Sequence, residues 1–394
     1  MARSGQGRDG RRRLVELQAV RDVPPPAWDG LVADDSPFLE WAWLSSLEDS
    51  GSASPSTGWT PRHLTLWEDD RLLGACPVYE KDHSMGEFVF DQGWATAAMR
   101  AGIEYYPKLV VGVPMTPITG ARVLARPEVR TDAVAAFAGV LEDRCTAGDF
   151  SSAHVNFCRG MEVGELGARG WFRRTGLQYH WTNGGFATFD DYLGSLRSKR
   201  RNQVRRERRD VAAAGVEVSV LAGHEIPDDL FPQMYELYSR TVDRLPWGQR
   251  YLNRRFFELV RERFRDRLTF VVARQKGQLV AGAFNVEKGD TLYGRYWGAR
   301  RGVRYLHFEV CYYAGIQHCI ARGLRRFEPG AGGEFKHLRG FDAVATESMH
   351  WIAHPGLAAA VREYLGRERR AVADEIEWFG SRTALRRERR EPDA

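Results

Sequence analysis

The sequence has no long apolar segment. No run approaches the roughly 18 apolar residues that a membrane-spanning helix requires. The first 20 residues, MARSGQGRDGRRRLVELQAV, are basic but contain no apolar core of the kind that secretory signal peptides have. From these two absences we expect a soluble protein with no membrane insertion and no signal peptide.

Cysteine is also scarce, with five cysteines among 394 residues (Cys76, Cys145, Cys158, Cys311 and Cys319). The number is odd and no pair has CxxC spacing, so we expect reduced thiols in a cytoplasmic protein rather than a disulfide framework. Two of them share a predicted helix with His307 and His318, but the spacing matches no zinc pattern. No serine or cysteine has the sequence context of a catalytic nucleophile. We therefore expect no metal site and no covalent nucleophile.

The composition is that of a globular protein of two domains. Hydrophobic residues make up 43% and aromatic residues 12% of the chain, which is long enough for two sizeable cores. We predict a disordered basic N-terminus over residues 1–13, a first domain over 14–180, a second over 181–380 and a charged tail over 381–394.

A weak internal repeat supports the two domains. The segment LTLWEDDRLLGA (residues 64–75) resembles VVARQKGQLVAGA (residues 271–283), and Gly74-Ala75 matches Gly282-Ala283 at an offset of 208. Residues 93–95 (Gly-Trp-Ala) fall near residues 297–299 (Trp-Gly-Ala). The alternative is that these matches are coincidental.

Each half then continues in the same order of elements. An apolar helix (residues 131–146 and 307–322) ends near a glycine (Gly148 and Gly323) and leads into a strand (residues 153–157 and 324–328). The first half holds about 30 extra residues before its helix, which we place at 104–126. A strand hairpin followed by a βαβ unit, twice, predicts an α/β fold with mixed sheets.

A strongly basic helix is predicted over residues 195–215. Eight of the thirteen residues from Arg197 to Arg209 are basic, and Glu207 is the one acid among them. Arginine side chains match phosphate oxygens, so we predict that Lys199, Arg200, Arg201 and Arg205 bind phosphate. The alternative is an exposed charged helix that pairs with neighbouring acids.

The stretch from Thr291 to Phe341 has the features of a site. It reads as a strand, a basic turn, a helix, a short strand and a glycine-rich loop, PGAGG, which ends in Glu334-Phe335-Lys336. Tyr293, Arg295 and Trp297 alternate along the strand, so we expect them to share one face. An arginine between two aromatic residues is costly in a core unless it is paired, which favours a ligand-binding face.

Three motifs resemble the FemAB-type transferases. Ser198-Lys199-Arg200-Arg201 with Arg205 and Gly215-Val216 is similar to their SKKxRxxIRxAxxxGV segment. The helix that follows Tyr305-Leu306 resembles their penultimate helix, and Gly332-Gly333-Glu334-Phe335-Lys336 with Gly340-Phe341 resembles their FKxGF-like motif. The segments LPWGQRYLNRRFF, LYGRYWGA and LHFEVCYYAGI are similar to the peptidoglycan biosynthesis/recognition branch of the GNAT superfamily, and the resemblance extends from about Phe38 to Val372.

This resemblance implies two tandem GNAT-like domains, the second carrying the activity. FemAB relatives transfer an amino acid from aminoacyl-tRNA to an amine of a peptidoglycan precursor, and simple GNAT proteins transfer acyl groups from acyl-CoA. The chain departs from both patterns. The turn from Arg300 to Arg304 lacks the full Q/R-x-x-G-x-G/A loop for the CoA pyrophosphate, and three residues instead of one separate Lys336 from Gly340.

Amide formation needs an unprotonated amine, close approach and donors for the oxyanion. We predict that Lys336 supplies positive charge to the oxyanion or holds an acceptor carboxylate. His307 and Glu309, at the start of the helix, are the candidates for accepting the amine proton, because a helix N-terminus lowers the pKa of a histidine and stabilises a carboxylate. The alternatives are a surface lysine, a packed imidazole and a helix cap. The predicted substrate-binding residues are Tyr293, Arg295, Trp297, Trp247, Gly332, Gly333, Glu334 and Phe335.

These expectations define an N-acyltransferase that works by direct attack of an amine on an activated acyl donor, with no tightly bound cofactor. Aminoacyl-tRNA is the preferred donor over acyl-CoA, because the basic helix suits a phosphate backbone. The acceptor bears an amine, on a peptidoglycan precursor or a small metabolite. The rival interpretation is a non-catalytic protein that binds a cell-wall precursor or a nucleic acid.

Overall fold

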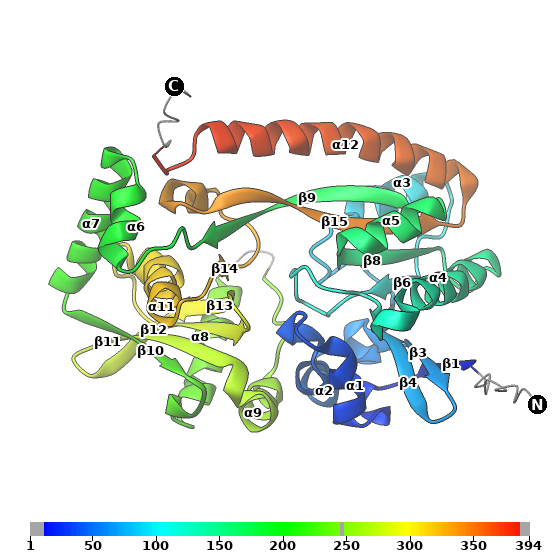
Figure 1. Cartoon of the computed structure of the whole chain (residues 1–394), viewed down its shortest axis with the longest axis horizontal. Coiled ribbons are helices and arrows are strands. Elements are labelled where there is room, and N and C mark those ends of the chain that lie inside the picture. The colour runs from blue at the N-terminus through cyan, green and yellow to red at the C-terminus, as the bar shows by residue number, and fades with distance from the viewer. Residues whose placement is uncertain (1–11, 245–247, 387–394) are drawn as a thin grey trace, which may run out of the picture. The chain divides into compact units, whose positions relative to one another are not determined.

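Two α/β units make up the chain, and three long elements run across the boundaries between them (Figure 1). The computed structural model describes residues 12–244 and 248–386. Unit 1 comprises Met1–Arg174 and Glu347–Leu365, and unit 2 comprises Thr175–Thr346 and Gly366–Ala394. The boundaries fall within β9 (Phe172–Thr182), β15 (Asp342–Ile352) and α12 (Pro355–Ser381).

Unit 1 contains two sheets. Its remaining strands and helices are β1 (Arg12–Leu17), α1 (Pro25–Val32), α2 (Trp41–Asp49), β2 (Thr60–Pro61), β3 (His63–Glu68), β4 (Arg71–Cys76), β5 (Val78–Lys81), α3 (Gln92–Arg100), β6 (Lys108–Val111), β7 (Leu124–Ala125), α4 (Arg130–Thr146), β8 (Ser152–Cys158) and α5 (Gly160–Ala168). One sheet has the order β1-β3-β4-β7, and the other runs β15-β8-β6-β5-β2. The apolar face of α4 packs on both and forms the main core of the unit.

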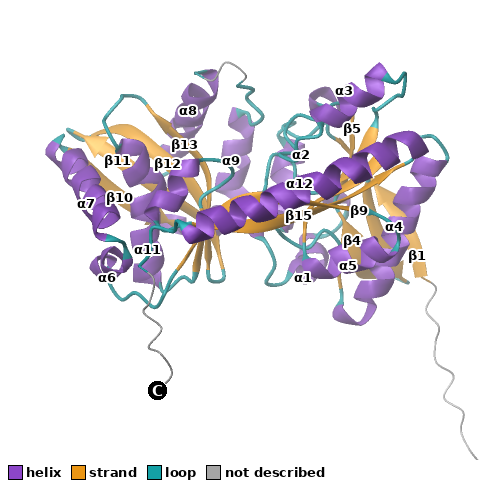
Figure 2. Ribbon diagram, turned by 90° about the horizontal axis from the view of Figure 1, so that it is seen from above, coloured by secondary structure: helices purple, strands orange, loops and turns teal. Residues whose placement is uncertain are grey.

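Unit 2 is built around one larger sheet of order β10-β11-β12-β13-β14-β9. Its elements are α6 (Phe189–Ser195), α7 (Ser198–Ala213), β10 (Val216–Ala222), α8 (Leu230–Asp243), α9 (Arg254–Arg263), β11 (Leu268–Gln275), β12 (Gln278–Lys288), β13 (Thr291–Ala299), α10 (Leu306–Phe308), a π-helical turn η7 (Glu309–Tyr313), α11 (Ala314–Arg322), β14 (Arg326–Glu328) and a 3-10 helix η8 (Glu334–Arg339). Helices α8 and α9 lie on one face of this sheet, and α11 lies on the other (Figure 2). Aromatic residues of α8 and α9 pack on the first face, and apolar residues of the α10–α11 segment pack on the second.

The two units repeat the same strand arrangement. In unit 2, β12 and β13 are antiparallel, β13 and β14 are parallel, and β14 and β9 are antiparallel. In unit 1, β5, β6, β8 and β15 have the same order and the same directions. The duplicated α/β architecture predicted from the sequence is therefore confirmed. Helix α4 and strand β8 also confirm the predicted helix and strand of the first half.

Two details of the predicted repeat are wrong. Both hairpins carry a bulge at the same place, and the register sets Gly74 opposite Leu66 where Ala281 lies opposite Ala273. The equivalent of Gly74 is therefore Ala281 and not Gly282. Residues 93–95 lie in α3, whereas residues 297–299 end β13, so these segments do not correspond.

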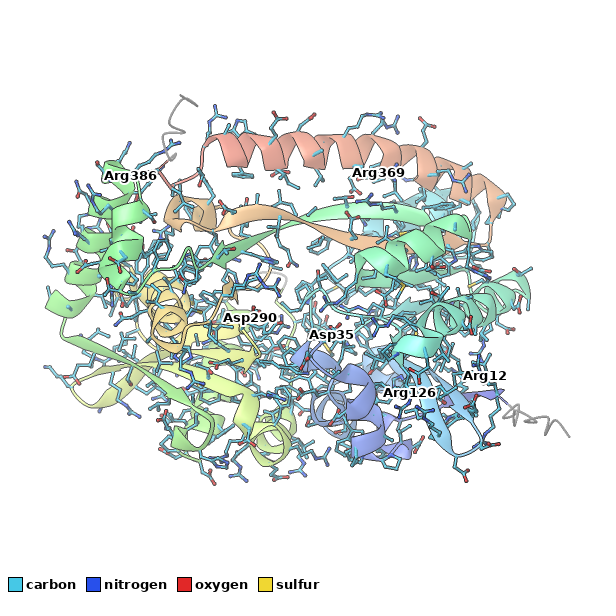
Figure 3. The ribbon with its side chains drawn as sticks, in the orientation of Figure 1. Arg12, Asp35, Arg126, Asp290, Arg369 and Arg386 are labelled. Atoms are coloured by element: carbon cyan, nitrogen blue, oxygen red, sulfur yellow. The ribbon has the colours of Figure 1, made fainter. Side chains whose placement is uncertain are left out.

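The extra residues of unit 1 occupy two connections. Residues 82–107 join β5 to β6, where unit 2 has only the tight turn at residues 289–290 (Asp290 is labelled in Figure 3). Residues 112–129 join β6 to α4 and contain β7. The predicted insertion at 104–126 therefore includes most of the second connection but misses most of the first.

The limits of the units differ from the predicted domains. The first boundary lies close to the predicted one at residue 180, but Glu347–Leu365 returns to unit 1, which a single boundary did not anticipate. Arg12 and Arg13 begin β1, within the range predicted to be disordered, and residues 1–11 lie outside the described residues. Of the predicted tail, residues 387–394 likewise lie outside them.

Candidate active site

A cavity of about 290 Å³ lies in unit 2 where β13 continues beyond the end of β14. The two strands pair only over Thr291–Tyr293. Beyond that point β13 faces the glycine-rich loop that follows β14. The cavity is lined by Ala283, Asn285, Gly294, Arg295, Tyr296, Trp297, His307, Cys311, Tyr312, Pro329, Gly330, Ala331, Gly332, Gly333 and Lys336.

Glycines let the loop approach the strand closely. A Cβ atom on Gly294 would lie 3.1 Å from the Cα atom of Pro329, which is tighter than ordinary contacts. Gly333, which precedes η8, has a φ angle of +87°, a conformation that side-chain-bearing residues rarely adopt. Gly332 and Gly333, two of the predicted substrate-binding residues, both line the cavity.

Lys336 reaches the cavity from η8 and is only 3% exposed. Its Nζ atom donates a hydrogen bond to the carbonyl oxygen of Gly330 at 2.5 Å. Burial lowers the pKa of the Lys336 ammonium to about 8. The side chain is therefore still mainly charged at neutral pH, and it is held by the loop that forms one wall of the cavity.

His307 enters the same cavity from α10. Its ring centroid lies 4.5 Å from that of Trp297 and 5.3 Å from that of Tyr312. Burial, and then the positive charges of Arg339 and Lys336, lower the pKa of His307 to about 4. The imidazole is neutral at pH 7, as expected, but burial is the principal cause rather than the helix N-terminus.

The shared face predicted for Tyr293, Arg295 and Trp297 is wrong. A bulge interrupts the β12–β13 ladder, so Gly294 pairs with Asn285 and Tyr296 pairs with Phe284, while Arg295 is the extra residue. An extra residue reverses the alternation beyond it. Arg295 and Trp297 consequently line the cavity, and Tyr293 lies on the other face, beside Val286 in the ladder.

Glu309 does not join His307 in this cavity. The helical segment after β13 passes from α10 into the π-helical turn η7, and Glu309, the first residue of that turn, lines a separate cavity. Its carboxylate forms an ion pair with Arg208 of α7 at 3.0 Å, and burial raises its pKa despite that arginine. The prediction that His307 and Glu309 share one site is wrong because the helix turns their side chains to different cavities.

The remaining predicted residues have mixed positions. Phe335 is 62% exposed and does not line the cavity, and Trp247 lies outside the described residues. Glu334 begins η8, which places it in the segment that carries Lys336. Lys199, Arg200, Arg201 and Arg205 lie on α7, which confirms the predicted basic helix.

A buried ion network that the sequence analysis missed holds Lys336 in place. Arg339, three residues after Lys336, donates hydrogen bonds to both carboxylate oxygens of Glu207 at 2.8 and 2.9 Å and to the Tyr313 hydroxyl at 2.7 Å. Tyr313 also donates to Glu207. The network links η8, α7 and η7. The signal was the single acid between Arg197 and Arg209, because an isolated Glu207 among arginines points to a specific partner.

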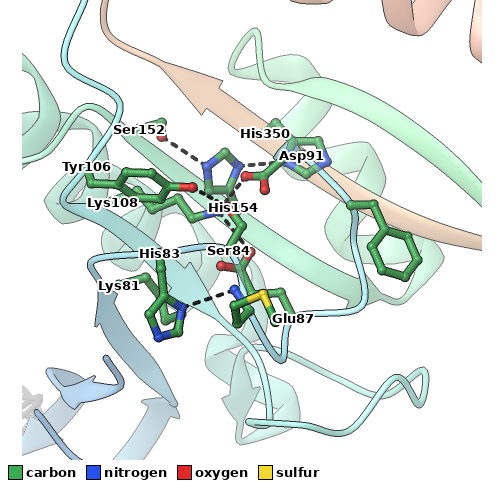
Figure 4. A network of polar contacts seen from close by, with 12 residues as sticks. Lys81, His83, Ser84, Glu87, Asp91, Tyr106, Lys108, Ser152, His154 and His350 are labelled. Atoms are coloured by element: carbon green, nitrogen blue, oxygen red, sulfur yellow. Dashed lines mark hydrogen bonds and ion pairs between the residues drawn. The ribbon is translucent and has the colours of Figure 1, made fainter. Parts of the chain in front are cut away.

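A second buried polar cluster, in unit 1, was also missed (Figure 4). The fully buried Lys108 ammonium donates to Ser84 at 3.1 Å and to Glu87 at 3.0 Å, and it pairs with Asp91. Beside it, the Nδ1 atoms of His154 and His350 are 2.7 Å apart. Ser84, Glu87 and Asp91 all come from the connection that replaces the tight turn of unit 2. A lysine at the start of the apolar strand KLVV was the available signal.

None of the helices in residues 12–244 and 248–386 is long and apolar enough to cross a bilayer. In the same part of the chain no group of three or more His, Cys, Asp or Glu side chains is placed to hold a metal ion. The five cysteines are free thiols.

Solved structures share this fold at low identity. The crystal structure of FemX matches with a TM-score of 0.52 and 11% identity, covering 86% of this chain and 98% of FemX. The C-terminal domain of a putative lysylphosphatidylglycerol synthetase from Agrobacterium fabrum has a TM-score of 0.52 and 11% identity over 85% of this chain and 93% of that domain. L-PGS from Bacillus licheniformis has a TM-score of 0.50 and 9% identity, over 82% and 95%.

The predicted fold class, α/β with mixed sheets in two tandem GNAT-like domains, is confirmed by the repeated strand arrangement and the likeness to FemX. No curated protein matches the sequence. The FemAB-like family, described as peptidoglycan biosynthesis/recognition, matches residues 19–387. The match covers nearly the whole chain and supports a transferase-type function. The chain therefore belongs to the FemAB-like family of peptidoglycan biosynthesis/recognition proteins.

Proposed function

We propose that the protein is an N-acyltransferase that moves an aminoacyl group from aminoacyl-tRNA to the amine of a peptidoglycan precursor. The single observation that carries the proposal is that a charged lysine, Lys336, and a neutral histidine, His307, line the same cavity of unit 2. Membership of the FemAB-like family supports the same class of reaction.

Lys336 stabilises the developing negative charge. When the amine attacks the ester carbonyl, its oxygen becomes an oxyanion, and a buried ammonium beside it lowers the barrier most because little water competes. The hydrogen bond from Lys336 to the Gly330 carbonyl fixes the ammonium before the substrate arrives. Arg339 and Glu207 hold the 3-10 helix that carries the lysine.

His307 orients the attacking amine. With a pKa of about 4 it is neutral at pH 7 but a weak base, so we assign it to accept a hydrogen bond from the amine. This differs from the role expected from the sequence, which was to take the proton. The C–N bond forms, the ester C–O bond breaks, and the departing ribose oxygen leaves with the proton that the amine loses.

Arg295 and Trp297 complete the walls of the cavity. The Arg295 guanidinium matches a carboxylate or phosphate of the substrates, and the Trp297 ring, packed on His307, keeps the imidazole oriented. Glycines in the loop allow backbone N–H groups close to the acyl group.

Aminoacyl-tRNA is the proposed donor because α7 is strongly basic. Among the described residues no ion pair is found for Lys199 or Arg209, both of which are exposed. Unpaired surface cations arranged along one helix suit a phosphate backbone. Acyl-CoA is the competing donor.

Binding to mixed aminoacyl-tRNA and, separately, to acetyl-CoA, each at two salt concentrations, tests the donor. We expect salt-sensitive tRNA binding and no CoA binding. Tight CoA binding alone would replace aminoacyl-tRNA by acyl-CoA as donor, with residues 300–304 as the phosphate site. Binding of neither would favour a non-catalytic protein that recognises a cell-wall precursor.

A further inference from the structure

A second cavity in unit 2, of about 590 Å³, is lined by the basic helix α7 together with α6, β10, η7 and α11. This size falls within the roughly 300–1,000 Å³ of small-molecule sites. It is called the α7 recess here and is lined by Phe189, Asp190, Leu193, Arg205, Arg208, Arg209, Val211, Ala212, Val216, Val218, Glu309 and Gln317. Three arginines, an aromatic ring and an apolar floor thus share one space.

Arg208 is held rigidly in the recess. Its guanidinium pairs with Glu309 at 3.0 Å and donates to Gln317 at 2.9 Å. The same group lies over the ring of Phe189, 4.4 Å from the centroid. A fixed guanidinium stacked on an aromatic ring is a planar surface on which a nucleic-acid base can stack.

Arg205 and Arg209 supply positive charge that acidic side chains compensate less closely than that of Arg208. The Arg205 side chain is 55% exposed, and its one ion pair among the described residues is with Asp190, at the long distance of 3.9 Å. Arg209 is exposed and has no ion pair among the described residues. Residues four apart on a helix project from the same side, so the two guanidinium groups are placed to share one anion.

We propose that the α7 recess binds one unstacked nucleotide of the acyl donor, with its phosphate on Arg205 and Arg209 and its base against the Arg208–Phe189 pair. The proposal rests on the proposed function, because both candidate donors carry an adenine nucleotide. In tRNA this is the unpaired 3′ end, and in CoA it is the phosphorylated adenosine. The apolar floor from Val211 to Val218 suits the flat face of a base better than a free phosphate.

The recess is a direct neighbour of the active-site cavity. The π-helical turn η7 presents Glu309 to the recess and Cys311 and Tyr312 to the cavity. Turns of this kind are rare and occur often at functional sites. A nucleotide that contacts Arg208 therefore binds next to Glu309, which belongs to the turn that forms one wall of the active-site cavity.

Binding of small nucleotide probes to the full chain tests the proposal. The probes are a 5′-phosphorylated CCA trinucleotide, CoA and inorganic phosphate, measured by calorimetry at low salt. We expect Arg205→Gln and Arg209→Gln each to weaken binding of the trinucleotide or CoA about tenfold or more, as loss of a charged hydrogen bond would. Arg206→Gln is the matched control, because Arg206 is an exposed arginine of the same helix that does not line the recess, and it should change the affinity less than twofold.

A second variant separates the base from the phosphate. Phe189→Leu should weaken binding of the trinucleotide or CoA but leave the weak binding of inorganic phosphate unchanged. The trinucleotide and CoA arms tell which donor the recess serves. Equal losses for Arg206→Gln and Arg209→Gln, or equal affinity for phosphate and both nucleotides, would overturn the proposal.

The role of Lys336 in acyl transfer can be tested separately from nucleotide binding in the α7 recess. Lys336→Ala should bind the nucleotide probe as the unmodified protein does, because Lys336 does not line the recess. Normal binding with lost transfer supports both ideas. Normal binding with unchanged transfer would remove the role of Lys336 and leave the nucleotide site standing.

Discussion

The two units place different chemistry on the same arrangement of strands. In unit 1 the connection of residues 82–107 supplies Glu87 and Asp91, which form ion pairs with the buried Lys108, and Ser84, which accepts a hydrogen bond from it. In unit 2 the corresponding connection is the tight turn at residues 289–290, and an open cavity lies farther along the strand. Ionic groups that are closed in by an insertion serve stability, and those left beside a cavity remain available to a ligand.

A buried polar pair occupies the equivalent place in both units. The ladder registers align His154 and His350 of unit 1 with Glu328 and His180 of unit 2. In unit 2 these two side chains lie 3.7 Å apart. The polar pair is thus common to both units, whereas the buried cluster around Lys108 belongs to unit 1.

The largest expected effect comes from removing the ammonium group of Lys108. Lys108→Met leaves Glu87 and Asp91 buried without their cation, and we expect the free energy of unfolding to fall by about 3–5 kcal/mol. Urea denaturation measures the change, with Lys276→Met, at an exposed turn, as the control. A loss below about 1 kcal/mol would mean that unit 1 does not depend on the cluster.

Replacing Lys336 of unit 2 should reduce catalysis rather than stability, in contrast to the replacement of Lys108. We expect Lys336→Ala to lower kcat by about 10²–10³, equivalent to about 2.7–4 kcal/mol of transition-state stabilisation. Unfolding free energy should change far less, because the Lys336 side chain has one hydrogen bond to a carbonyl group. Steady-state transfer kinetics with Lys276→Ala as control measure the effect, and unchanged kcat would contradict the assignment.

The sequence predicted the parts of the site that depend on local pattern. The sequence placed α7, the His307–Arg322 helix and the glycine-rich loop that precedes Lys336, but not the 3-10 helix η8 that carries it. It did not predict the bulge at Arg295, because ladder register depends on the partner strand and a one-residue slip moves every later side chain to the other face.

Long-range partners were likewise invisible in the sequence. Glu207 and Arg339 are 132 positions apart, and the π-helical turn that directs Glu309 to Arg208 leaves no periodic signal. The unit 1 cluster joins side chains of two strands to an insertion whose position was only partly predicted. Such contacts follow from tertiary packing and not from local composition.

A moderate effect is expected at His307. Replacement by glutamine keeps a hydrogen-bond acceptor but loses the packed ring, so we expect kcat to fall about tenfold, as for the loss of one well-placed hydrogen bond. The pH dependence of kcat between 5 and 8 should keep its shape, because a group with a pKa of about 4 does not titrate there. A changed profile would show that His307 carries the proton after all.

A pH dependence of stability is also expected in unit 1. Burial raises the pKa of Glu87 to about 7, so the folded state binds a proton more tightly than the unfolded state and stability falls as pH rises from about 4.5 to 7. Burial lowers the pKa of Lys81 to about 7, so stability rises again from about 7 to 10.5. The two groups together predict a minimum near pH 7, with slopes of no more than about 1.4 kcal/mol per pH unit.

Unfolding curves at several pH values test this minimum. Glu87→Gln should remove the slope on the acid side, and Lys81→Met should remove the slope on the basic side. Slopes that survive both substitutions would assign the pH dependence to other groups.

We assign acyl transfer to the unit 2 cavity. The most direct test is a crystal structure with a stable amide analogue of 3′-aminoacyl-adenosine. We expect the carbonyl oxygen of the analogue to lie about 2.7–3.1 Å from the Nζ atom of Lys336, with the aminoacyl group between His307 and Trp297. A carbonyl group bound in unit 1, or outside the cavity that Lys336 lines, would contradict it.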